Sequence, residues 1–210
     1  VKLPDVREAA RALLSGGLSA RDRALLVDFD SEPRLVSGMT ADRRELSAGL
    51  DVLRADGSSD LFEAIVFSLQ QLGSASGRKA LVVYSDGIGE GEQTSYRECL
   101  REARRANIPV YLIVTNPRAA RAAAPGSGEG LDGYAERLAR LASATGGRAF
   151  FVRPSQDLGE VYTTILRELR SQYLLTYYPR EAAQEVWRKV DVEVKKRGFL
   201  ARTLSGYFTR

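Results

Sequence analysis

The stretch Lys79-Ala80-Leu81-Val82-Val83-Tyr84-Ser85-Asp86-Gly87 decides the fold class. Its middle, residues 80–84, is an apolar run between a lysine and a polar turn sequence. A run this short without polar alternation is typical of a parallel strand that is covered on both faces. Residues 110–114, Val-Tyr-Leu-Ile-Val, have the same character. We therefore expect at least two buried parallel strands.

Helical patterns separate these strands. Apolar residues at helical spacing predict helices over residues 5–15, 42–53, 60–72, 94–106, 131–144 and 155–172. Short β-rich runs predict a hairpin from residues 24–29 and 33–36 and one more strand over residues 148–152. The alternation of strands and helices predicts an α/β fold, a doubly wound and mostly parallel sheet flanked by helices.

The pattern changes after Ser171. Residues 173–178, 186–194 and 201–208 predict three strands without intervening helices, which we interpret as an antiparallel meander with packed aromatic side chains. This interpretation divides the chain into an α/β domain, residues 1–172, and a C-terminal β-strand extension, residues 173–210, packed on it.

Composition excludes several classes of function. The 210 residues suffice for one domain, or for one domain with a small appendage. The chain has no histidine, which excludes Ser-His-Asp catalysis, imidazole zinc sites and histidine pH switches. The single cysteine, Cys99, cannot form an internal disulfide. The 31 basic and 27 acidic residues are interspersed, which argues against a nucleic-acid partner, and no apolar run approaches the roughly 18 residues that cross a bilayer.

Polar residues follow the predicted strands where ligands bind in open parallel sheets. Asp28 and Asp30 follow the first strand, Asp86 the central one, and Thr115-Asn116 the next. A carboxylate directly after a buried strand could reach a hard cation or a substrate. From these residues alone, the simpler interpretation is that Asp86 caps its turn.

Two neighbouring loops carry weaker signals. The loop Gly57-Ser58-Ser59-Asp60 could present a hydroxyl to the same edge, although Ser and Asp are ordinary helix N-caps. The loop Gly87–Gly91 suggests a nucleotide-binding enzyme as an alternative. Its G-x-G-x-G spacing differs from the dinucleotide fingerprint, and Glu90 would repel a pyrophosphate.

The order of several segments resembles a von Willebrand factor type A domain. These segments are DRALLVDFD (22–30), GSSDLFEAI (57–65), KALVVYSDG (79–87) and IPVY (108–111). The tail LRSQYLLTYYP (169–179), with WRKV (187–190) and the late Gly206-Tyr207, is similar to the bacterial "VWFA-related" family. The resemblance implies a Rossmann-like sheet and a non-catalytic module that binds a protein partner. It also implies export to the periplasm or outside the cell.

The resemblance further implies a metal-ion-dependent adhesion site (MIDAS) at the carboxyl ends of the strands. Asp86 matches the Asp after the family's fourth strand, and Ser59 falls where a Thr ligand stands. The cofactor would be Mg²⁺, or Mn²⁺ or Ca²⁺. The family's Asp-x-Ser-x-Ser segment is absent, and with two matching residues most positions of the cation's oxygen shell would fall to water.

The family's first, central strand is absent as well. Its loss would leave the strands 24–29 and 81–84 with unpaired edges. Three explanations compete: the sequence omits an N-terminal segment, another chain donates the strand, or the sheet closes up directly. We favour omission, because Val1 is an improbable native start. A structural or assembly domain remains a further alternative for the function.

Overall fold

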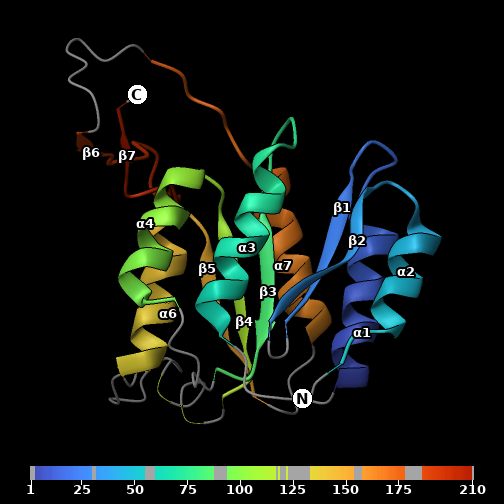
Figure 1. Cartoon of the computed structure of the whole chain (residues 1–210). Coiled ribbons are helices and arrows are strands. Elements are labelled where there is room, and N and C mark those ends of the chain that lie inside the picture. The colour runs from blue at the N-terminus through green and yellow to red at the C-terminus, as the bar shows by residue number, and fades with distance from the viewer. Residues whose placement is uncertain are drawn as a thin grey trace.

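The computed structural model describes residues 3–29, 32–54, 60–87, 94–116, 118, 122, 133–153, 158–177 and 186–209. The strands in these ranges form three separate sheets (Figure 1). The first is a hairpin, the second is a parallel sheet in the centre of the molecule, and the third is a small antiparallel pair near the C-terminus.

The central sheet contains β3 (Leu81–Ser85), β4 (Val110–Val114) and β5 (Arg148–Phe151), in that spatial order. All of its pairs are parallel, with Leu81 opposite Val110 and Ser85 opposite Val114. Strand β4 lies in the middle and is buried at all five positions. The expected pair of buried parallel strands is therefore confirmed, and strand ends agree with the predicted ones to within one residue.

Helices cover both faces of this sheet. One face packs against α3 (Leu61–Gly73), α4 (Tyr96–Ala106) and α6 (Gly133–Ala144), and the other against α1 (Leu3–Ala12) and α7 (Leu158–Arg170). Successive strand side chains alternate between the two apolar clusters: Val83 joins the first cluster, whereas Val82 and Tyr84 pack against the second. This arrangement confirms the predicted doubly wound α/β fold.

The predicted hairpin is confirmed: it consists of β1 (Ala24–Phe29) and β2 (Pro33–Thr40), with the second arm four residues longer than the predicted 33–36, and it forms a sheet of its own. A short π-helical turn, η1 (Leu13–Gly17), extends α1, and together with α2 (Arg43–Asp51) it packs against the hairpin. Strand β1 is not hydrogen-bonded to β3. Direct closure of the sheet, one of the three explanations for the missing central strand, is therefore wrong.

The C-terminal segment differs in part from the prediction. Strands β6 (Trp187–Lys189) and β7 (Gly206–Phe208) pair antiparallel, but residues 173–177 form no strand. Tyr173 and Leu174 are 91 % and 88 % exposed. β-Propensity reflects packing against a neighbouring strand, so these residues do not form a strand where no backbone pairs with them.

The small sheet lies against helix α4 of the α/β domain (Figure 1). The guanidinium carbon of Arg104 lies 4.6 Å from the centre of the Trp187 ring, and that of Arg105 lies 5.7 Å from the Phe208 ring. The Ser205 N–H donates to the carbonyl oxygen of Ala144 at 3.0 Å. The division into two units at residue 172 stays a prediction.

Candidate functional site

The carboxyl ends of β3 and β4 lie side by side at the lower edge of the sheet in Figure 1. The Thr115 N–H donates to the carbonyl oxygen of Ser85 at 2.9 Å, so the ladder continues past the last paired residues. Asp86 and Asn116 therefore follow neighbouring strands at the same edge. The Asp86 side chain is exposed there. We call this edge, formed by residues 85–87 and 115–116, the crest.

Gly87 fixes the course of the chain after Asp86. Its φ is +72°, in the left-handed region, and a Cβ at this position would lie 2.3 Å from Cγ1 of Val114. Glycine is therefore needed both for the backbone conformation and for the close approach to β4. The Gly87 N–H donates to the Ser85 hydroxyl oxygen at 3.1 Å. The turn that carries Asp86 is thus held tightly against the end of β4.

The Tyr84 side chain contacts Thr115 of the crest, where β3 and β4 end. The Tyr84 hydroxyl donates to Oγ1 of Thr115 at 3.3 Å. Burial raises the pKa of Tyr84, the hydrogen bond to Thr115 lowers it, and the negative charges of Asp5 and Asp86 raise it further. Tyr84 is therefore a neutral donor at physiological pH, and it holds the Thr115 side chain between the two strands.

The other described carboxylates that sequence analysis placed near this edge have structural roles. Asp28 is 8 % exposed and forms an ion pair with Arg34 at 3.0 Å. Asp60 accepts N–H bonds from Phe62 and Glu63 and so caps helix α3. Its second carboxylate oxygen accepts the Thr94 N–H at 2.9 Å. Among these described carboxylates, Asp86 is the one that the crest presents to solvent.

Several predicted positions lie outside the described residues: Ser59, Asp30 and residues 88–91 of the glycine-rich loop. Among the residues that the structure does describe, no three acidic or cysteine side chains cluster as they would around a metal ion. Asp86 is thus the described member of the expected ligand pair.

Sequence comparison gives a family match for the first half of the α/β part. Residues 2–88 match the family of the von Willebrand factor type A domain. By sequence over residues 2–88, and by fold beyond them, the chain matches a von Willebrand factor type A (VWA) domain. A comparison with curated protein sequences gave no significant match.

Solved structures share this VWA fold. An aerotolerance-related membrane protein from Bacteroides fragilis is 15 % identical, with a TM-score of 0.61 over 81 % of this chain and 89 % of its own. BatB from Bacteroides thetaiotaomicron is 18 % identical, with a TM-score of 0.58 over 80 % of this chain and 86 % of its own. The vWF domain of the type V pili tip protein Mfa5 from Porphyromonas gingivalis is 10 % identical, with a TM-score of 0.57 over 83 % and 90 %. At these identities the likeness establishes the fold alone.

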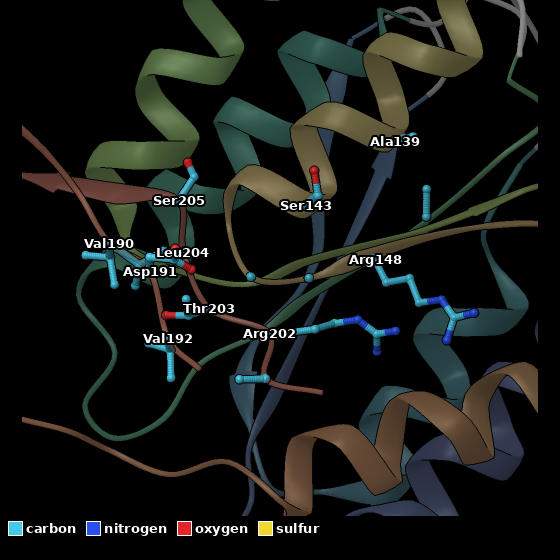
Figure 2. A pocket seen from close by; sticks show the side chains of 14 residues that line it. Ala139, Ser143, Arg148, Val190, Asp191, Val192, Arg202, Thr203, Leu204 and Ser205 are labelled. Carbon is cyan, nitrogen blue, oxygen red and sulfur yellow. The ribbon is translucent and has the colours of Figure 1, made fainter. Parts of the chain in front are cut away.

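A cavity of about 440 Å³ lies near the opposite end of the sheet from the VWA crest (Figure 2). It is lined by the turn between α6 and β5 and by the C-terminal segments 190–192 and 201–205, and it is open to solvent. Arg148 and Arg202 line it, and both contact the carboxylate of Glu168, which balances part of their charge. Sequence analysis missed this cavity because its walls are more than 40 residues apart along the chain.

No helix among the described residues is both long enough and apolar enough to cross a membrane.

Proposed function

We propose that this VWA domain is a non-catalytic interaction module that binds a protein partner at the crest. The observation that carries the proposal is the exposed Asp86 carboxylate on a turn fixed by contacts with β4. A rigid polar group next to solvent loses little conformational freedom on binding, so more of the contact energy contributes to affinity.

The chemistry of the chain favours binding over catalysis. No histidine is present to act as a general base. The Cys99 thiol, on the inner face of α4, is fully buried in the apolar cluster, and burial raises its pKa far above the usual value. A thiol in this state is not a nucleophile at neutral pH. The Mfa5 vWF domain belongs to a pilus tip protein, which fits an adhesive role for this fold.

We further propose that a divalent cation, Mg²⁺, Mn²⁺ or Ca²⁺, takes part in this binding. Asp86 would supply a carboxylate oxygen and Ser59 a hydroxyl oxygen. Both are hard ligands of the kind these ions prefer. The described residues fit such an ion only in part, because they offer one exposed carboxylate at the crest. Water and a carboxylate of the bound partner would complete the shell.

The crest and the cation can be tested separately. The immobilised domain is incubated with a lysate of the organism that encodes it. The proteins that it retains are compared between wild type, Asp86→Ala and Asp191→Ala. Asp191 is also an exposed carboxylate, but it lines the cavity at the other end of the sheet. We expect that at least one protein is retained by wild type and by Asp191→Ala but not by Asp86→Ala. Equal retention by all three would refute binding at the crest.

The cation is tested by calorimetric titration of the same three proteins with MnCl₂ and MgCl₂. Binding by wild type and Asp191→Ala, but not by Asp86→Ala, supports a cation at Asp86. A partner retained equally with and without EDTA would refute the cation while leaving the interaction module intact.

A further inference from the structure

The cavity of about 440 Å³ forms where the two strands of the C-terminal sheet separate. The Val190 N–H still donates to the carbonyl oxygen of Ser205 at 3.1 Å. The neighbouring Leu204 instead forms an isolated bridge with Thr145 of the α/β domain. The two C-terminal segments therefore line one side of the cavity, and helix α6 with the turn into β5 lines the other (Figure 2).

Two guanidinium groups in this cavity share one carboxylate. Nη1 of Arg202 donates to Oε1 of Glu168, and Nη1 of Arg148 lies 3.6 Å from the same oxygen. Burial, the charge of Glu168 and a hydrogen bond to that carboxylate raise the pKa of Tyr111 to about 12, so the Tyr111 hydroxyl adds no charge. We call Arg148, Arg202 and Glu168 the arginine cluster. It carries one net positive charge.

The acidic residue in the cavity wall does not balance this charge. Asp191 is exposed, and Figure 2 shows it beside Val190, on the opposite side of the cavity from the two guanidinium groups. Among the residues that the structure describes, the ion pairs of Arg148 and Arg202 go to Glu168 alone. One positive charge is therefore available to a ligand.

The two arginines also keep hydrogen-bond donors for that ligand. Their contacts with Glu168 use one nitrogen of each guanidinium group, and their side chains are 44 % and 39 % exposed. A guanidinium group has five N–H donors in a rigid plane, which suits the two oxygens of a carboxylate. The guanidinium carbon of Arg148 lies 4.7 Å from the centre of the Phe150 ring, and this contact helps to hold the group in place.

We propose that this cavity binds a monocarboxylate with an apolar body. The carboxylate contacts Arg148 and Arg202 and balances the charge of the arginine cluster. The apolar body lies against Ala149, Val192 and Leu204 of the cavity wall. A second negative charge on the ligand would have no partner there, and burying it would cost free energy. The volume lies in the range of about 300–1,000 Å³ that is typical of small-molecule sites.

The probe is sodium hexanoate, titrated into the isotope-labelled full chain and followed by NMR. The backbone amides of Arg148, Ala149 and Thr203 should shift saturably, with a Kd on the order of 1 mM for a ligand of this size. The amide of Asp86, at the crest, should not move, because the cavity lies near the opposite end of the sheet. Hexanamide has the same size without the charge and should cause no shift.

Three variants with native circular dichroism spectra test the balance of charges. Arg202→Gln should raise the Kd of hexanoate at least about tenfold, because a charged hydrogen bond is lost. Glu168→Gln leaves both guanidinium groups to the ligand and should lower the Kd. Arg101→Gln is the control: Arg101 pairs with Glu98 and Glu102 on α4 and should be replaceable without effect on binding.

A second pair of probes identifies the source of the carboxylate. These probes are the peptide N-acetyl-Val-Ala-Val with a free C-terminal carboxylate and the same peptide as its C-terminal amide. The Val152 N–H donates to Val114 of β4, so the Ala149 N–H faces the outer edge of β5, where an extended peptide could pair. Slower exchange at Ala149 with the free-acid peptide alone assigns the site to a polypeptide C-terminus. Binding of hexanoate but of neither peptide assigns it to a free acid.

Four results would overturn the proposal. The first is the absence of any shift at about 10 mM hexanoate, roughly ten times the expected Kd. The second is equal binding of hexanoate and hexanamide. The third is an equal Kd in Arg202→Gln and Arg101→Gln, or weaker binding in Glu168→Gln, since the cluster would then have a structural role only. The fourth is tighter binding of inorganic phosphate than of hexanoate.

Discussion

Replacing Asp60 by alanine should destabilise the domain more than an ordinary helix cap does. The carboxylate is 8 % exposed and accepts three backbone N–H groups. Its Oδ1 lies 3.0 Å from the Phe62 nitrogen and 3.1 Å from the Glu63 nitrogen, and its Oδ2 lies 2.9 Å from the Thr94 nitrogen. One side chain thus caps helix α3 and ties it to the segment that leads into α4.

The magnitude follows from these contacts. Loss of an N-cap costs about 0.5–2 kcal/mol. The Thr94 N–H also loses a charged acceptor in a part-buried position, which adds about 1.5–3 kcal/mol. We expect Asp60→Ala to lower the free energy of unfolding by about 2–5 kcal/mol. The control is Asp42→Ala, an exposed cap of α2 with two N–H bonds, for which we expect about 0.5–1 kcal/mol.

Urea unfolding followed by far-UV circular dichroism measures both changes, with equal m-values as the check for two-state behaviour. The free energy of unfolding of Asp60→Asn should lie between those of wild type and Asp60→Ala. The amide keeps an oxygen that accepts the cap N–H bonds, but it turns an NH₂ group toward the Thr94 N–H. A cost for Asp60→Ala within about 0.5 kcal/mol of that for Asp42→Ala would refute the reasoning.

Three further predictions concern other parts of the fold. Gly87→Ala should lower the unfolding midpoint in urea more than Gly77→Ala does. Both residues have positive φ, but only at Gly87 would a Cβ press against β4. Equal effects would mean that backbone strain alone accounts for the loss and that the contact with β4 contributes nothing. Arg104→Ala should shift the emission of Trp187, the single tryptophan, to longer wavelength, because the guanidinium covers its ring; an unchanged spectrum would contradict that contact. Burial raises the pKa of Tyr162 to about 12. The stability that comes from burying the neutral phenol is therefore complete below pH 10 and is lost as pH rises toward 12. The urea midpoint should fall less between pH 10 and 12 in Tyr162→Phe than in wild type.

The local elements of the fold were predictable from the sequence. The apolar runs 80–84 and 110–114 predicted strands, and Asp42 and Asp60 were correctly placed at the starts of helices α2 and α3. These features depend on short-range chemistry, namely apolar periodicity and side chains that bond nearby N–H groups.

The C-terminal strands were less predictable. Residues 173–177 have strong β-propensity, but a strand forms only where another backbone pairs with it. The lengths of β6 and β7 are likewise set by their mutual pairing. Pairing between residues about 20 positions apart is not encoded in the composition of either segment.

The sequence by itself determined the alternation of strands and helices, the absence of histidine chemistry and the position of Asp86 directly after a buried strand. Tertiary structure decided the use of each carboxylate: Asp28 pairs with an arginine, Asp60 ties two helices, and Asp86 is exposed. It also decided that β1 and β3 stay unpaired with each other. The physical reason is that partners of side chains and strand edges come from distant segments, and only folding brings these together.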